Sequence, residues 1–162
     1  MFPLEIETLA RLLIDEARER RLRIVTAESC TGGLVAGAIC SIAGASDVFE
    51  RGFVTYTNRA KQEMLNVPGD LIADLGEVSE AVARMMAEGA LENSNAHIAV
   101  AITGVAGPSG GSPMKPVGTV HLATARANAG IRHRHERFDG PERLDVQLAA
   151  VAVALQMLRD AV

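Results

Sequence analysis

The chain has 162 residues, of which 48% are hydrophobic and 22% charged, as in an ordinary globular protein. A net charge of −4 and a pI near 5.6 argue against a general nucleic-acid-binding protein, which usually carries a basic surplus. We expect no disulfide framework from the two cysteines, Cys30 and Cys40, and no apolar run approaches the roughly 20 residues of a membrane span. We therefore expect one domain over residues 1–162, in the cytoplasm.

The first half of the chain alternates helix and strand patterns. Apolar residues at helical spacing predict a helix over 4–20, and an apolar run predicts a buried strand over 22–28. Small apolar residues predict a packed helix over 31–43, and β-branched and aromatic residues predict a second strand over 51–57. A short helix should follow, capped by Asn58.

The second half continues this alternation. A short helical piece should end near Leu75, and Ser79 should cap the next helix, which runs to about residue 94. The remaining elements are a strand buried on both faces, a hairpin and a long amphipathic helix, over 97–104, 118–138 and from Pro141. The pattern indicates an α/β protein with a mixed, mostly parallel sheet covered on both faces.

The segment TAESCTGG, residues 26–33, lies where a predicted strand runs into a predicted helix. Sites in α/β proteins collect at such strand ends, and the free N–H groups of a first helical turn favour an anion. Ser29 is the candidate nucleophile, and Gly32 and Gly33 allow a ligand close to the backbone. The alternative is that Ser29 or Thr31 only caps the helix.

Cys30 is a rival nucleophile, because a thiol at a helix N-terminus is expected to have a lowered pKa. No histidine is obviously placed to pair with it, and a zinc site on His133 and His135 would lack a third ligand nearby in sequence. The other two histidines, His97 and His121, belong to predicted strands. We therefore expect no metal site.

Two further segments carry candidate site residues. In TYTNRAKQ, residues 55–62, Tyr56 ends a strand, and Lys61 could deprotonate a serine if its pKa were lowered. A packed tyrosine and a solvated surface lysine are the alternative interpretation. After Thr103, the loop 104–118 is a candidate cradle for phosphate or ribose, although it has neither a P-loop nor a dinucleotide fingerprint.

Four segments in matching order, AESCTGGLVA, SDVFERGFVTYTNRAKQEML, VSEAVARMMAEGAL and AITGVAGPSGGSPMKPVGTV, resemble the C-terminal domain family of CinA, the competence/damage-inducible protein. The similarity runs from about Arg23 to His121. It implies a three-layer α/β/α sandwich with a mixed sheet. It also implies hydrolysis of nicotinamide mononucleotide to nicotinate mononucleotide and ammonia, with no metal or organic cofactor. A second, N-terminal domain carried by many relatives is not expected here.

The resemblance also implies roles for individual residues. Ser29 would be the nucleophile, Lys61 the base and Tyr56 a further catalytic residue, and the backbone N–H groups from Thr31 to Gly33 would hold the oxyanion. The substrate would lie on Thr103, Gly104, Gly107 and Arg143. Gln147 stands where relatives often carry a second arginine, so alternative phosphate ligands are Arg51, Arg59 and Lys115.

Two other functions stay open at this point. The chain could be a nucleotide-binding module without catalytic activity, or an interaction protein tied to competence or DNA damage. For partners we expect a small-molecule substrate and a homo-oligomer, with no nucleic acid and no membrane.

Overall fold

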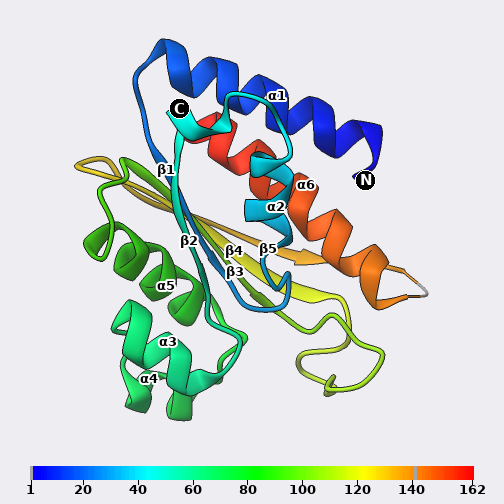
Figure 1. Cartoon of the computed structure of the whole chain (residues 1–162). Helices are drawn as coiled ribbons and strands as arrows, with labels where there is room; N and C mark the ends of the chain where they lie inside the picture. Colours follow the sequence, from blue (N-terminus) through cyan, green and yellow to red (C-terminus); the bar gives the residue numbers. More distant parts are fainter. Residues whose placement is uncertain (1, 141) are drawn as a thin grey trace.

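The computed structural model describes residues 2–140 and 142–162, which form one sheet with helices on both faces (Figure 1). The sheet has the strand order β2-β1-β3-β4-β5. Its strands are β1 (Ile24–Glu28), β2 (Phe49–Val54), β3 (Ile98–Gly104), β4 (Thr119–Arg126) and β5 (Gly130–Arg137). Strand β1 pairs in parallel with β2 and β3, whereas β4 runs antiparallel to β3 and β5. All strands except β4 thus point the same way, which confirms the mixed sheet.

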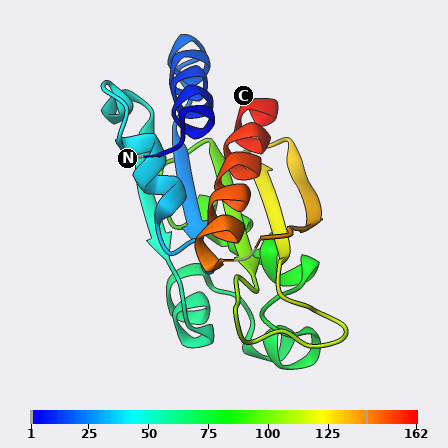
Figure 2. The same cartoon turned by 90° about the vertical axis from the view of Figure 1, so that its right-hand side faces the viewer.

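Two helical layers complete the three-layer α/β/α sandwich that was expected. One face carries α1 (Leu4–Glu19), α2 (Leu34–Cys40) and α6 (Arg143–Ala161), and Figure 2 shows the blue α1 and the red α6 in front of the sheet. The other face carries α5 (Glu80–Glu92), on which α3 (Asn58–Leu65) and α4 (Gly69–Leu75) pack. Among the described residues, no helix combines the length and the apolarity that crossing a membrane requires.

Strand β3 is buried on both faces, as its near-continuous apolar run predicts. Ile98, Val100 and Ile102 belong to the core under α1, α2 and α6, whereas Ala99 and Ala101 belong to the core under α5. Strand β1 is buried along its whole length in the same way. The central strands are therefore packed on both faces, and this packing also holds the residues at their carboxyl ends in place.

Several element boundaries differ from the predicted ones. The helix expected over 31–43 covers only Leu34–Cys40, because residues 29–33 form a turn, and the strand expected over 51–57 covers Phe49–Val54. Thr57, not Asn58, caps α3, since its side chain accepts a hydrogen bond from the amide of Ala60. The predicted helix start at Pro141 lies outside the described residues.

Capping contacts stabilise the starts of α5 and α6. Ser79 caps α5 as predicted, with Oγ accepting from the Val82 amide at 3.3 Å. At the start of α6, the side chain of Glu142 and that of Asp145 each accept a hydrogen bond from the other residue's backbone, which makes a capping box.

Candidate active site

A pocket of about 390 Å³ lies at the carboxyl ends of β1 and β3. It is lined by the turn after β1, the segment from β2 to α3, the turn before α5, the loop after β3 and the start of α6. Figure 2 shows that loop and the start of α6 at the same end of the sheet. The predicted site residues that line the pocket are Ser29, Tyr56, Lys61, Thr103, Gly104, Gly107 and Arg143.

Ser29 and Lys61 are in direct contact in this pocket. Lys61 Nζ donates to Ser29 Oγ at 3.1 Å and to the carbonyl oxygen of Thr55 at 3.1 Å. Lys61 is 1% exposed, and burial lowers its pKa below the ordinary 10.5, against an opposing effect of the Glu77 carboxylate. Because only the neutral amine accepts a proton, this arrangement suits a lysine that deprotonates a serine.

Sheet register brings the two side chains together. Ser29 directly follows β1 and donates its amide to the carbonyl oxygen of Ile102 in β3 at 2.9 Å. Thr55 directly follows β2, and its amide donates to the carbonyl oxygen of Glu28 at 2.8 Å, which extends the parallel pairing of β1 and β2. The first turn of α3 then carries Lys61 back to the end of β1.

Cys30 lies beside Ser29, but its thiol is not activated. The side chain is 5% exposed, and burial raises its pKa to about 12, the opposite of the lowering expected from sequence. A thiol with that pKa is protonated near neutral pH and is therefore a poor nucleophile. The structure thus favours Ser29 over Cys30 as the nucleophile.

The carboxylate of Glu28 caps α2, a role for which the sequence left Ser29 and Thr31 as alternatives. Glu28 is fully buried at the end of β1. It accepts hydrogen bonds from four donors, which are the Thr31 hydroxyl (2.7 Å) and the amides of Gly33 (3.1 Å), Val35 (3.0 Å) and Ala36 (2.8 Å). The first turn of α2 is therefore already occupied by an anion from the protein itself.

Arg143 joins two sides of the pocket. Its guanidinium donates to Tyr56 Oη at 2.8 Å and to the carbonyl oxygen of Gly107 at 2.7 Å. Gly107 has a φ of +83°, a conformation that few other residues adopt. Among residues 2–140 and 142–162, Tyr56 makes no hydrogen bond to Lys61. Its hydroxyl oxygen accepts a hydrogen bond from Arg143, whereas the Lys61 amine donates to Ser29.

Glu77 is a pocket residue that sequence reasoning missed, and Thr103 holds it in place. The Thr103 hydroxyl donates to the carbonyl oxygen of Glu77 at 2.7 Å and thereby ties the turn before α5 to the end of β3. Glu77 lines the pocket and acts on the pKa of Lys61. No sequence pattern signals this role, because the segment has only the features of a helix start.

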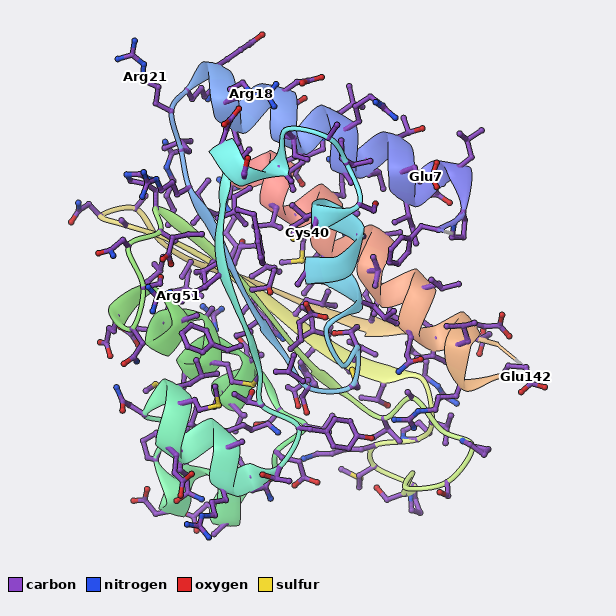
Figure 3. The ribbon with its side chains drawn as sticks, in the orientation of Figure 1. Glu7, Arg18, Arg21, Cys40, Arg51 and Glu142 are labelled. Atoms are coloured by element: carbon purple, nitrogen blue, oxygen red, sulfur yellow. The ribbon has the colours of Figure 1, made fainter. Side chains whose placement is uncertain are left out.

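The alternative phosphate ligands lie elsewhere. Arg51 pairs with Glu50, and Figure 3 shows it on the opposite side of the molecule from Glu142, which precedes Arg143. Arg59 pairs with Glu63 on the surface of α3. The ammonium of Lys115 donates to the carbonyl oxygen of Leu75 and lines a different pocket, together with His121.

The histidines are also separate from the pocket. His97 accepts the amide of Arg23 through Nδ1, and His121 and His133 share a hydrogen bond of 2.9 Å between their rings. Burial lowers the pKa of His121 to about 4. Within the described ranges, no group of three or more His, Cys, Asp or Glu side chains is arranged to hold a metal ion.

Comparisons with known proteins found several similar chains. The CinA-like protein of Akkermansia muciniphila is 54% identical over 118 residues, which are 73% of this chain and 28% of that protein. A putative competence-damage inducible protein of Caldicellulosiruptor bescii is 40% identical, with 98% of this chain and 38% of that protein matched. The chain thus spans well under half the length of these two relatives.

Two other proteins are similar over nearly their whole length. The nicotinamide-nucleotide amidohydrolase PncC of Escherichia coli is 48% identical over 95% of this chain and 93% of that protein. The crystal structure of the competence/damage inducible protein CihA from Agrobacterium tumefaciens superposes with a TM-score of 0.97 at 51% identity, covering 99% and 97% of the two chains. Residues 6–162 match the model of the CinA C-terminal domain, and the chain belongs to that family.

Proposed function

We propose that this chain hydrolyses nicotinamide mononucleotide to nicotinate mononucleotide and ammonia. The buried contact of 3.1 Å between Lys61 Nζ and Ser29 Oγ carries the proposal, because it pairs a nucleophile with a base whose pKa is lowered. A pocket of about 390 Å³ is within the usual range for small-molecule sites. The similarity to a relative named as a nicotinamide-nucleotide amidohydrolase supports the choice of substrate.

The reaction would proceed through an acyl-enzyme. Ser29 Oγ attacks the carboxamide carbon while its proton passes to Lys61 Nζ. The carbon–nitrogen bond then breaks, and ammonia leaves with the proton that Lys61 returns. A water molecule gives a proton to Lys61 and attacks the acyl carbon, and Ser29 regains its proton as nicotinate mononucleotide forms.

Arg143 and the loop after β3 would bind the ribose phosphate. Besides Lys61, Arg143 is the basic residue that lines this pocket among the described residues, and its planar guanidinium suits a phosphate. In this proposal Tyr56 orients the guanidinium, and Gly104 and Gly107 keep the backbone of the loop close to the ligand. Thr103 anchors the turn that carries Glu77.

The test is ammonia release by the purified chain from nicotinamide mononucleotide, with and without an excess of a metal chelator. We expect release at equal rates in both conditions, with nicotinate mononucleotide formed in equal amount. Tight binding of the nucleotide without ammonia release would identify a binding module without catalytic activity. Release that the chelator abolishes would contradict the serine–lysine mechanism.

The rate should depend on pH through Lys61. Its protonated form cannot accept the Ser29 proton, so we expect kcat/KM to rise with pH through the pKa of Lys61. Since Glu77 raises that pKa, Glu77→Gln should move the rise to lower pH. The control is Glu63→Gln on the exposed side of α3, which should leave the profile in place. A profile that moves to higher pH in Glu77→Gln would refute this account.

A further inference from the structure

Two backbone amides in the turn after β1 have no acceptor among residues 2–140 and 142–162. The amide of Ser29 donates to Ile102, that of Gly32 to the Ser29 carbonyl oxygen at 3.0 Å, and that of Gly33 to Glu28. The amides of Cys30 and Thr31 remain, on residues that are 5% and 1% exposed. Cys30 lines the pocket, and Thr31 is the next residue of the same turn. Buried N–H groups are almost always paired, so these two call for an acceptor from outside the described residues.

Both amides are held in fixed orientations by their own peptide units. In a trans peptide the N–H and the C=O point in opposite directions, so a bond that fixes the carbonyl also fixes the amide. The Ser29 carbonyl oxygen accepts from the Gly32 amide at 3.0 Å, which orients the Cys30 amide. The Cys30 carbonyl oxygen accepts from Gln147 Nε2 at 2.8 Å, which orients the Thr31 amide.

Gln147 reaches this turn from a distant part of the chain. It lies on α6, one helical turn after Arg143, and its contact with Cys30 joins residues 117 positions apart. A hydrogen bond to a carbonyl also polarises the peptide and strengthens its N–H as a donor. The contact therefore acts on both the direction and the strength of the Thr31 amide.

We propose that the amides of Cys30 and Thr31 form the oxyanion hole for the reaction at Ser29, and that Gln147 is the positioning residue of this hole. The inference rests on the proposed function for the nucleophile. When the bond from Ser29 Oγ to the substrate carbon forms, the electron pair of the carbonyl bond moves to oxygen, and the two amides hold that charge. The amides of Gly32 and Gly33, expected from sequence, are already used within the protein.

The first test compares three variants with nicotinamide mononucleotide as substrate. We expect Gln147→Ala to lower kcat by about 10- to 100-fold, because small misplacements of reacting groups have effects of this size. KM should change by less than about twofold, since the hole acts on the transition state. Gln147→Arg keeps a donor on the same turn and should restore most of kcat. The matched control is Gln156→Ala, on the same helix but bonded to Asp160.

A second test needs no natural substrate. A fluorophosphonate probe labels an activated serine: the Ser29 oxygen–phosphorus bond forms, the phosphorus–fluorine bond breaks, fluoride leaves and the proton passes to Lys61. Mass spectrometry of the Ser29 peptide measures the rate of labelling. We expect Gln147→Ala to be labelled about 10- to 100-fold more slowly than the wild type, and Gln156→Ala to be labelled at the wild-type rate.

The two tests separate this inference from the proposed function. Labelling at Ser29 that Gln147→Ala slows, without ammonia release from the nucleotide, would refute the proposed substrate and support the oxyanion hole. Equal labelling of Gln147→Ala and the wild type would overturn the oxyanion hole, and so would a wild type that the probe leaves unlabelled at Ser29. If Gln147→Ala raised KM and left kcat unchanged, the positioning role of Gln147 would be overturned.

Discussion

Replacing either Ser29 or Lys61 by alanine should lower ammonia release from nicotinamide mononucleotide by about 10³-fold or more, because removal of either member of a nucleophile–base pair disables both. The pair is in contact at 3.1 Å, and the buried thiol of Cys30, with a pKa raised to about 12, offers no substitute at neutral pH. Lys61→Arg should be equally inactive, since a guanidinium stays protonated and cannot act as a base.

The other lysine of the chain provides the matched control. Lys115 donates to Leu75 in a different pocket, so Lys115→Ala should keep activity within a few-fold of the wild type. Steady-state kinetics and circular dichroism on all variants separate lost chemistry from lost folding. A Ser29→Ala protein that is folded and retains most of its turnover would exclude Ser29 as the nucleophile.

The second large effect is on stability, at Gly89 in α5. A Cβ at this position would overlap the backbone carbonyl oxygen of Leu65, at the end of α3, and a backbone atom cannot swing aside. We expect Gly89→Ala to lower the free energy of unfolding by about 3 kcal/mol, as overpacking of a close contact does. Urea unfolding followed by circular dichroism measures the change.

Gly37 in α2 is the control for that experiment. It is also a helical glycine, but a Cβ there would meet only the ring of Phe2, at 3.6 Å, an ordinary van der Waals distance. Gly37→Ala should therefore raise the free energy of unfolding by about 0.5–1 kcal/mol, because alanine loses less backbone entropy in a helix. If both variants lost stability equally, the close approach of α3 to α5 would not be the cause.

Local patterns predicted much of the fold because they concern neighbours in the chain. The apolar run of β3 and the cap at Ser79 are examples, since each depends on a few consecutive residues. The contacts that cap α2 could not be predicted in the same way. Capping rules consider the residue next to the helix, whereas Glu28 reaches across the whole turn to the amides of Val35 and Ala36.

The sequence predicted residues that the structure brings into one pocket, but it did not predict their contacts. The family resemblance named Ser29, Lys61 and Arg143, and the structure places all three in one pocket. Their partners depend on tertiary packing, which no local pattern contains. The bond from Gln147 to Cys30 and the bond from Thr103 to Glu77 join segments far apart in sequence, and each needs the finished sheet to bring its ends together.

The position of the serine–lysine pair also leads to an expectation for how activity responds to heat. Ser29 extends the pairing of the central strands β1 and β3, and Thr55 extends the pairing of β1 with the edge strand β2. Residues 55–57 connect β2 to α3, and the Lys61 amine on α3 donates back to the carbonyl oxygen of Thr55 at 3.1 Å. Separating Ser29 from Lys61 requires α3 to leave its place against α5, where Leu65 is fully buried, and inactivation by heat should therefore accompany global unfolding instead of preceding it.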